Sequence, residues 1–278
     1  MKIMKDEYGH VNCTVMYVEE NIPGTIEDTD EYTNLITNFN SQLTDHCNCD
    51  TNCVKNTCKC LSRSGGANYE FRDEDQSPHI LLNFKKYTGS SISFPLMECN
   101  SLCKCSEYCG NRVVQKGPIK CLVVKPCTVS SKGMGLFTSK AIPKGTFICE
   151  YAGEVITPQQ AAMRNQMNFE QGRMNYIFCL NEFSNSTLTQ TIVDPSNFGN
   201  IGRYINHSCE PNCFIVPVRV ESPLPKLAIF SNVDIPSNSE ITFNYGSHIM
   251  NLSKSIKNRK KCLCEKKNCI GYMPNEAY

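Results

Sequence analysis

The chain has 278 residues, of which 40% are hydrophobic, and this is enough to bury a sizeable core. Its formal net charge is +1, so the overall charge does not favour nucleic acid as the main partner. The first residues are charged and polar, and no apolar run approaches the roughly 18 residues that a membrane span needs, which favours a soluble, intracellular protein with no membrane partner.

Residues 1–46 are the least informative part of the chain. Asn21–Asp30 contains Pro, Gly and several acidic residues and is typical of a loop. Asn34–Leu43 fits a short helix or a strand, and its pattern does not separate the two. We expect this segment to wrap around the module that follows.

The nineteen cysteines are the most unusual feature of the composition. Many form C-x-C pairs, and neighbours this close are poor disulfide partners but good ligands for one ion or for adjacent ions. Without a secretory leader, the cysteines therefore favour metal thiolates, and their spacing indicates zinc. If thirteen are thiolates on four zinc ions, as assigned below, the folded protein is mildly acidic and suits a basic partner.

Two runs hold nine of these cysteines: C-x-C-x3-C-x4-C-x-C and C-x3-C-x-C-x3-C. Three tetrahedral zinc ions need twelve bonds, which six terminal and three bridging thiolates supply. We therefore predict a three-zinc cluster held by Cys47, Cys49, Cys53, Cys58, Cys60, Cys99, Cys103, Cys105 and Cys109. The module has few apolar residues, so the metal would supply its folding free energy. Ser62–Lys86, between the runs, is polar and is predicted to be a loop insertion.

The region after the second run predicts short strands around one helix. Thr157 and Pro158 fit the N-cap and first position of a helix that ends near Met167, and Lys132–Gly135 fits a tight turn. Strands are predicted at Ile119–Lys125, Leu136–Phe137, Thr146–Tyr151, Asn175–Leu180, Thr191–Val193, Val216–Val220 and Leu227–Phe230. The region is therefore mostly β or α+β, and it has no dinucleotide fingerprint, P-loop or Gly-x-Ser-x-Gly elbow.

The stretch Gly199–Cys213, G-N-I-G-R-Y-I-N-H-S-C-E-P-N-C, is predicted to be a binding turn for a small molecule that is also held by metal. Near the C-terminus, C-x-C-x4-C supplies only three zinc ligands: Cys262, Cys264 and Cys269. Cys209 is the favoured fourth ligand, with His248 and Cys213 as alternatives. A zinc ion at this site would hold the C-terminal tail over the Gly199–Cys213 turn.

The order of the motifs resembles that of SET-domain protein lysine methyltransferases with Pre-SET and Post-SET zinc modules. The nine clustered cysteines are followed by K-G-M-G, E-Y-A-G-E, N-Y-I-F, G-R-Y-I-N-H-S-C-E-P-N, F-N-Y-G and C-x-C-x4-C. The resemblance extends from Cys47 to about Pro274. It implies a mostly β fold with α+β elements, in which short strands and small sheets form a pseudoknot flanked by zinc modules.

The resemblance also implies a division of the chain into four parts. A wrapping segment at 1–46 would be followed by a Pre-SET zinc cluster at 47–114, a SET catalytic domain at 115–247, and a Post-SET zinc module with its tail at 248–278. In the pseudoknot, the segment around Asn206 would pass beneath the strand that leads to Tyr245.

Carried over by position, the resemblance implies a site that binds S-adenosylmethionine on one face and admits a lysine from the other. The cofactor would contact Lys132, Gly133, Met134, Tyr176, Arg203, Asn206 and His207. The lysine channel would be lined by Tyr151, Tyr176, Phe178, Phe243 and Tyr245, with Tyr245 and Tyr151 as the catalytic pair. Met134 departs from the family, which usually has Trp at this position.

The family further implies a nuclear, chromosome-bound enzyme that methylates a histone H3 tail or nucleosome at lysine 9 or lysine 36. Phe243 lacks a hydroxyl that would hold a water molecule, so we predict di- or trimethylation by a monomer. The alternatives are a catalytically weak, zinc-stabilised chromatin-binding module and a methyltransferase for a non-histone protein. Lys257–Lys267 could contact nucleic acid, but a solvated face near a zinc site explains this basic cluster equally well.

Overall fold

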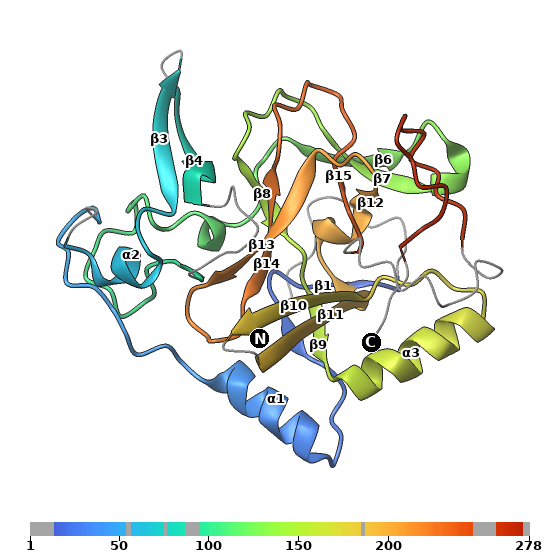
Figure 1. Ribbon diagram of the computed structural model, residues 1–278, viewed down its shortest axis with the longest axis horizontal. Helices are drawn as coiled ribbons and strands as arrows, with labels where there is room; N and C mark the ends of the chain where they lie inside the picture. Colours follow the sequence, from blue (N-terminus) through green and yellow to red (C-terminus); the bar gives the residue numbers. More distant parts are fainter. Residues whose placement is uncertain are drawn as a thin grey trace.

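The computed structural model describes residues 14–53, 57–74, 77–86, 95–184, 187–246 and 260–274 (Figure 1). Small sheets of short strands make up most of it, in agreement with the fold predicted from the sequence. Two larger sheets lie at the centre, and the helices lie at the periphery (Figure 1).

The first central sheet is built around the long strand β11 (Thr187–Gly199). β10 (Phe178–Ser184) and β9 (Gly153–Ile156) pair with it in antiparallel orientation. The pairing with β9 shifts register between Asp194 and Gly199, and on the other edge the end of β11 pairs with β1 (Met16–Tyr17) in parallel orientation. The sheet ends with β2 (Ile22–Pro23), which pairs in parallel with β9.

The N-terminal segment therefore differs from what we predicted. Its strands β1 and β2 add to the sheet of the SET region and do not simply wrap the cysteine module. Asn34–Leu43, which the sequence left open, lies largely in helix α1 (Asp30–Asn40), whose first turn is capped by the Thr29 hydroxyl.

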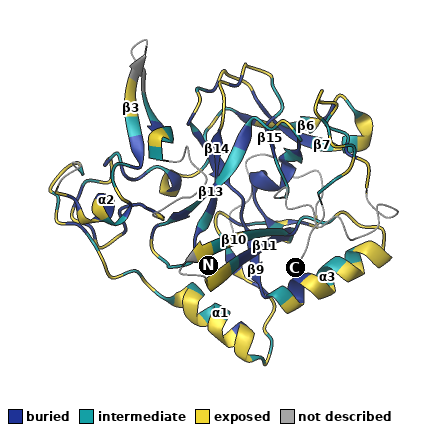
Figure 2. Cartoon of the chain, viewed as in Figure 1, coloured by how far each residue is buried: buried dark blue, intermediate teal, exposed yellow. Residues whose placement is uncertain are grey.

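The second central sheet has the order β5 (Leu96–Met97), β13 (Cys213–Arg219), β14 (Lys226–Ser231) and β8 (Phe147–Glu150). Nearly every residue of β14 and β8 is buried (Figure 2). Their side chains belong to two apolar clusters, Leu227 and Ile229 to one and Ala228 and Phe230 to the other, so both faces of these strands are buried. The short parallel pair β5–β13 attaches the cysteine module to this sheet.

Two smaller pairs of strands shape the site. β6 (Leu122–Pro126) and β7 (Met134–Thr138) form a hairpin whose connection includes a 3₁₀ turn at Ser130–Lys132. Gly133 follows this turn with a φ of 74°, a conformation that favours glycine. β12 (Asn206–His207) and β15 (Thr242–Phe243) pair in parallel, which produces the expected crossing of the two segments.

Helix α3 (Pro158–Glu170) begins where the sequence predicted and ends three residues later than Met167. Thr157 and Gln160 form a complete capping box, and Pro158 occupies the first turn. Within the described ranges, the helices are too short or too polar to cross a membrane.

The prediction of a loop over Ser62–Lys86 was wrong. This part of the chain contains the end of α2 (Lys59–Arg63) and a hairpin of β3 (Tyr69–Glu74) and β4 (Ser77–Leu82) that projects from the body (Figure 1). Tyr69 and Leu82 are buried at the base of the hairpin, whereas Phe71, further out, is exposed. Buried and exposed side chains do not alternate along the described part of these strands, since Leu81 and Leu82 are both buried, so the strand signal was weak.

Candidate active site

Four aromatic rings from three segments of the chain meet beside the β12–β15 pair. Tyr151 follows β8, Phe178 begins β10, and Phe243 and Tyr245 lie in and just after β15. Ring centroids are 6.1 Å apart for Tyr151 and Phe178, 5.8 Å for Tyr151 and Phe243, and 5.0 Å for Phe243 and Tyr245. Most of these contacts are edge to face, the arrangement that aromatic quadrupoles favour. The structure thus brings together four of the five residues predicted for the channel, and Tyr176 lines the same cavity.

The two tyrosines in this cluster are held by backbone groups. The Tyr151 hydroxyl donates to the Tyr176 carbonyl oxygen at 2.5 Å, and the Tyr245 hydroxyl donates to the Ile205 carbonyl oxygen at 2.8 Å. The Tyr245 N–H also donates to His207 Nδ1 at 3.2 Å. Each ring therefore has a fixed orientation.

A cavity of about 530 Å³ connects this aromatic cluster with the turn after β6. Its walls contain most of the predicted cofactor residues: Lys132, Gly133, Met134, Tyr176, Arg203 and Asn206. Sequence reasoning missed Ser130, Ser131, Met174, Asn175, Ile177 and Tyr204, which also line it. Nothing in a single sequence distinguishes these residues from ordinary loop positions.

Arg203 and Tyr176 form one wall of this cavity. The Arg203 guanidinium lies over the Tyr176 ring, with 4.4 Å between its carbon and the ring centroid. Arg203 Nε donates to the Pro195 carbonyl oxygen at 3.1 Å, which fixes the side chain from behind. The stacked pair offers a flat surface with positive charge to a ligand.

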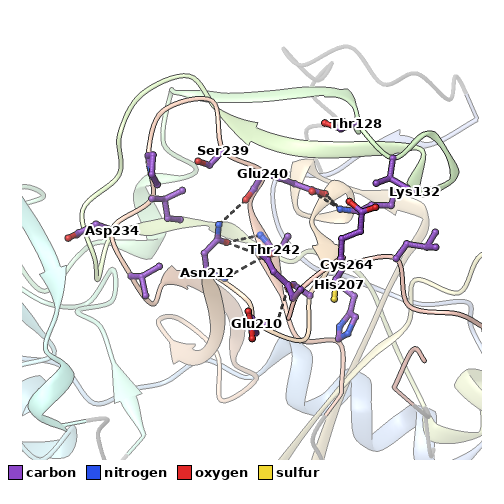
Figure 3. A pocket seen from close by; sticks show the side chains of 18 residues that line it. Thr128, Lys132, His207, Glu210, Asn212, Asp234, Ser239, Glu240, Thr242 and Cys264 are labelled. Carbon is purple, nitrogen blue, oxygen red and sulfur yellow. Dashed lines mark hydrogen bonds and ion pairs between the residues drawn. The ribbon is translucent and has the colours of Figure 1, made fainter. Parts of the chain in front are cut away.

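His207 is the one predicted cofactor residue that does not line this cavity. It lines a neighbouring cavity of about 430 Å³ beside the C-terminal cysteines (Figure 3). Lys132 borders both cavities, and Glu240 stands next to it in the second one. The predicted cofactor residues therefore extend from the aromatic cluster, past Lys132, to the second cavity.

Four cysteines from two distant segments meet beside His207. Cys209, Cys262, Cys264 and Cys269 have all their sulfur atoms within 4.8 Å of one another. The Cys209 sulfur lies 3.8 Å from that of Cys262, about the separation of two sulfurs on one tetrahedral zinc ion with bonds near 2.3 Å. The four residues are those predicted, and they suit a structural zinc site with four thiolate ligands. Of the alternative ligands, Cys213 is buried in β13, and His248 lies outside the described residues.

The nine cysteines of the two N-terminal runs pack into one cluster. Sulfur atoms are 3.4 Å apart for Cys53 and Cys99, 3.5 Å for Cys60 and Cys103, and 3.6 Å for Cys47 and Cys53. These distances are too long for disulfides, and the described cysteines are all free thiols. Three groups of four sulfur atoms overlap, and each contains Cys47. Overlap of this kind is expected where thiolates bridge neighbouring metal ions. The donor set thus fits a cluster of zinc ions.

Comparison with known families agrees with this architecture. The model of the SET domain matches residues 133–246, and that of the Pre-SET motif matches residues 4–112. The chain belongs to the SET-domain histone-lysine N-methyltransferases, as the order of its motifs predicted.

Within this family, the chain is similar to histone-lysine N-methyltransferase SETMAR. It is 40% identical to the human protein over 237 residues, which are 82% of this chain and 33% of that protein. It is 38% identical to the rat protein over 238 residues, which are 82% of this chain and 71% of that one. The chain thus spans about a third of human SETMAR's length and most of the rat protein's.

Solved structures show the same fold. The methyltransferase domain of human SETMAR aligns with a TM-score of 0.74 at 36% identity, covering 96% of this chain and 91% of that one. Arabidopsis thaliana SUVH6 in complex with SAM aligns with a TM-score of 0.68 at 25% identity, covering 98% of this chain and 52% of that one. The predicted mostly β SET fold is confirmed.

Proposed function

We propose that this chain transfers methyl groups from S-adenosylmethionine to a lysine of a histone H3 tail. The observation that carries the proposal is the 530 Å³ cavity, in which the Lys132–Met134 turn and Asn206 face the same space as the four-ring cluster. A methyltransferase needs a cofactor pocket and a lysine channel that meet at one point, because the reaction is an in-line displacement whose rate depends on alignment.

The cofactor would be held by the predicted residues of the two cavities. Arg203 supplies positive charge for the carboxylate of an amino-acid group, and Asn206 and the backbone of the Lys132–Met134 turn supply hydrogen bonds. When bound, S-adenosylmethionine supplies a methyl group on a positively charged sulfur atom. Crystallisation of SUVH6 with this cofactor supports the assignment.

The aromatic cluster would prepare the substrate lysine. A lysine amine must be neutral to attack, and an apolar channel disfavours the ammonium form and so lowers its pKa. The Tyr245 hydroxyl would orient the amine, and Tyr151, fixed by its bond to the Tyr176 carbonyl, would keep the channel narrow. The same rings can hold a methylated ammonium by cation–π contact.

Phe243 supports di- or trimethylation. It is buried at the centre of the cluster, where both Tyr151 and Tyr245 contact its ring. A phenyl ring has no hydroxyl to hold a water molecule, so space remains for a second or third methyl group. The zinc ions, three in the nine-cysteine cluster and one in the four-cysteine site, would be structural because their ligand sets are closed.

The substrate would be lysine 9 or lysine 36 of histone H3, bound as an added strand on an exposed sheet edge. Relatives named as histone-lysine N-methyltransferases include both SETMAR and Su(var)3-9 proteins, which supports a histone without choosing the lysine. A nuclear, chromosomal location and a monomeric state follow as parts of the proposal, as do the domain limits at 46, 114 and 247.

Methylation of peptides tests the substrate. H3 peptides that contain lysine 9 or lysine 36 would be incubated with the protein and S-adenosylmethionine, each beside a peptide with arginine in place of that lysine. Mass spectrometry should detect methyl groups on one lysine peptide and on neither arginine peptide. If no H3 peptide gains a methyl group although the protein binds the cofactor, H3 tail peptides are not its substrate, and this result favours the non-histone alternative.

A chromatin-binding module without catalysis is the second candidate, and Met134 is the observation that favours it. The family usually has Trp here, and Met134 is part of the cavity wall. If the Trp ring of other family members packs on the cofactor, Met134 loses that contact. If only the backbone at this position contacts the cofactor, Met134 keeps it. Calorimetry with S-adenosylmethionine separates the two: an enzyme gives a binding isotherm, and a module that has lost its cofactor site gives no heat.

A further inference from the structure

The carboxylate of Glu240 connects two parts of the proposed cofactor site. Lys132 Nζ donates to its Oε1 at 2.7 Å and to its Oε2 at 2.5 Å. Asn206 Nδ2 donates to Oε1 at 2.9 Å, and the Cys127 thiol donates to the same oxygen at 3.4 Å. One side chain outside the motifs thus holds the turn after β6 and the Asn206 side chain together.

Glu240 is itself fixed by its backbone (Figure 3). Asn212 Nδ2 donates to the Glu240 carbonyl oxygen at 2.8 Å, while Asn212 Oδ1 accepts from the Thr242 N–H at 2.8 Å. On the other side, Glu240 forms a bridge with Phe137 of β7. The carboxylate therefore projects from a rigid support rather than from a flexible loop.

These bonds determine which way the Asn206 amide faces. Its nitrogen donates to Glu240 Oε1, to the Met134 carbonyl oxygen at 3.1 Å and to the Cys127 sulfur at 3.3 Å. The two oxygens are acceptors, so only the NH₂ end of the amide can face them. Asn206 also lines the 530 Å³ cavity, so the carbonyl oxygen at the other end of the amide would be available to accept a hydrogen bond from the ammonium group of an amino-acid ligand.

Gly135 shows how closely these groups cross. A Cβ at this position would lie 2.7 Å from the Cys127 sulfur and 3.1 Å from both Asn206 Nδ2 and Glu240 Oε1. Such distances leave no room for a side chain. The absence of one at Gly135, the second glycine of K-G-M-G, therefore allows Asn206 and Glu240 to meet directly beside the backbone.

We propose that Glu240 is a positioning residue for the cofactor: it holds the Lys132 turn in place and orients the Asn206 amide. The inference rests on the proposed function, because it assumes that the ligand is S-adenosylmethionine. Removing the negative charge would leave the Lys132 ammonium without its partner, and the amide without the strongest of its acceptors.

Calorimetry with S-adenosylmethionine tests the proposal on the wild-type chain and on Glu240→Gln. We expect Glu240→Gln to raise the dissociation constant about tenfold or more, because Lys132 and Asn206 both lose a hydrogen bond to a charged carboxylate. Glu182→Gln is the matched control: Glu182 pairs with Arg219 at 2.8 Å, and its side chain is 23% exposed against 22% for Glu240. The control should bind the cofactor as the wild type does.

Kinetics separate positioning from a general loss of structure. At saturating S-adenosylmethionine, Glu240→Gln should keep kcat within about threefold of wild type while its KM for the cofactor rises with the dissociation constant. Lys132→Met should weaken binding too, and the double variant should be no weaker than the worse single one, because both remove one interaction. If Glu240→Gln proves unstable, Lys132→Met alone tests the contact, because it removes the same ion pair from the other side.

The outcomes are distinct. If Glu240→Gln binds as tightly as the wild type, or if Glu182→Gln weakens binding equally, Glu240 has no positioning role. If the wild type itself shows no binding, the proposed function fails and this inference fails with it.

Discussion

The Tyr245 hydroxyl donates a hydrogen bond of 2.8 Å to the backbone carbonyl oxygen of Ile205, 40 residues earlier in the chain. The bond lies next to the parallel pair of strands β12 and β15. It therefore joins the two crossing segments of the pseudoknot at a residue of the proposed lysine channel. Tyr245 also lines the 530 Å³ cavity, so this bond fixes its hydroxyl beside the space proposed for the methyl group. Oxygen atoms in this position can accept weak C–H hydrogen bonds from an electron-poor methyl group.

Tyr245→Phe should abolish most of the activity without unfolding the protein. The ring would still pack on Phe243 and His207, but the hydroxyl that orients the amine would be absent. We expect the rate of methylation to fall about a hundredfold or more, as for a reactant that loses its alignment. Cofactor affinity measured by calorimetry should change little, and a large loss of affinity would place the hydroxyl in the cofactor site instead.

Phe243→Tyr should limit the product. The new hydroxyl would occupy space next to the amine, so the second and third methyl groups would add slowly while the first still transfers. Mass spectra of a methylated peptide should then show mainly one added methyl group, against two or three for the wild type. An unchanged product distribution would mean that Phe243 does not set the methylation state.

Cys209→Ser should remove one zinc ion from the chain. Cys209 is the single ligand of the proposed four-cysteine site that comes from outside the C-terminal run. Metal analysis should therefore give about four zinc ions for the wild type and about three for Cys209→Ser. Cys213→Ser is the control, because Cys213 is buried in β13 and is not part of the four-sulfur group, and it should retain the full number. An equal loss of zinc in both variants would contradict the assignment.

Arg164→Met should destabilise the fold. Arg164 on α3 bonds Glu154 and Asp194 at 2.8 Å each, and these two carboxylate side chains are only 6% and 2% exposed. Without the arginine, two buried carboxylates would lose the cation they share. Loss of one partner from a buried ion pair typically costs about 3–5 kcal/mol, so the midpoint of thermal unfolding should fall by several degrees.

Arg63→Met is the comparison for this prediction. Arg63 pairs with Asp45 at 3.4 Å, and the Asp45 side chain is 69% exposed. An exposed ion pair contributes little to stability, so this variant should unfold close to the wild-type temperature. Equal unfolding temperatures for the two variants would show that the Arg164 pairs do not stabilise the fold.

The sequence predicted those parts of the molecule that depend on local chemistry. The N-cap of α3 at Thr157, the clustered cysteines and the residues of the G-R-Y-I-N-H-S-C motif were all recognisable, because residue type and spacing carry the signal. The family resemblance then connected motifs that are far apart in the chain, such as those of Tyr151 and Tyr245.

The features that the sequence did not reveal depend on long-range pairing. Strands β1, β2, β12 and β15 have two residues each, and such segments are strands only because distant partners meet them. In the described part of the β3–β4 hairpin, Tyr69 and Leu82 are buried near its base, Phe71 is exposed, and the side chains show no clear alternation. Glu240 stands in the stretch N-S-E-I, and only the fold brings it to Lys132 and Asn206.

The most direct test of the account is mass spectrometry of histone H3 and of nucleosomes incubated with the protein and S-adenosylmethionine, with Tyr245→Phe beside the wild type. We expect the wild type to add two or three methyl groups to one lysine of H3 and the variant to add almost none. If neither protein modifies H3 although metal analysis gives the full zinc content, the histone methyltransferase proposal is contradicted, and a non-histone substrate or a binding role takes its place.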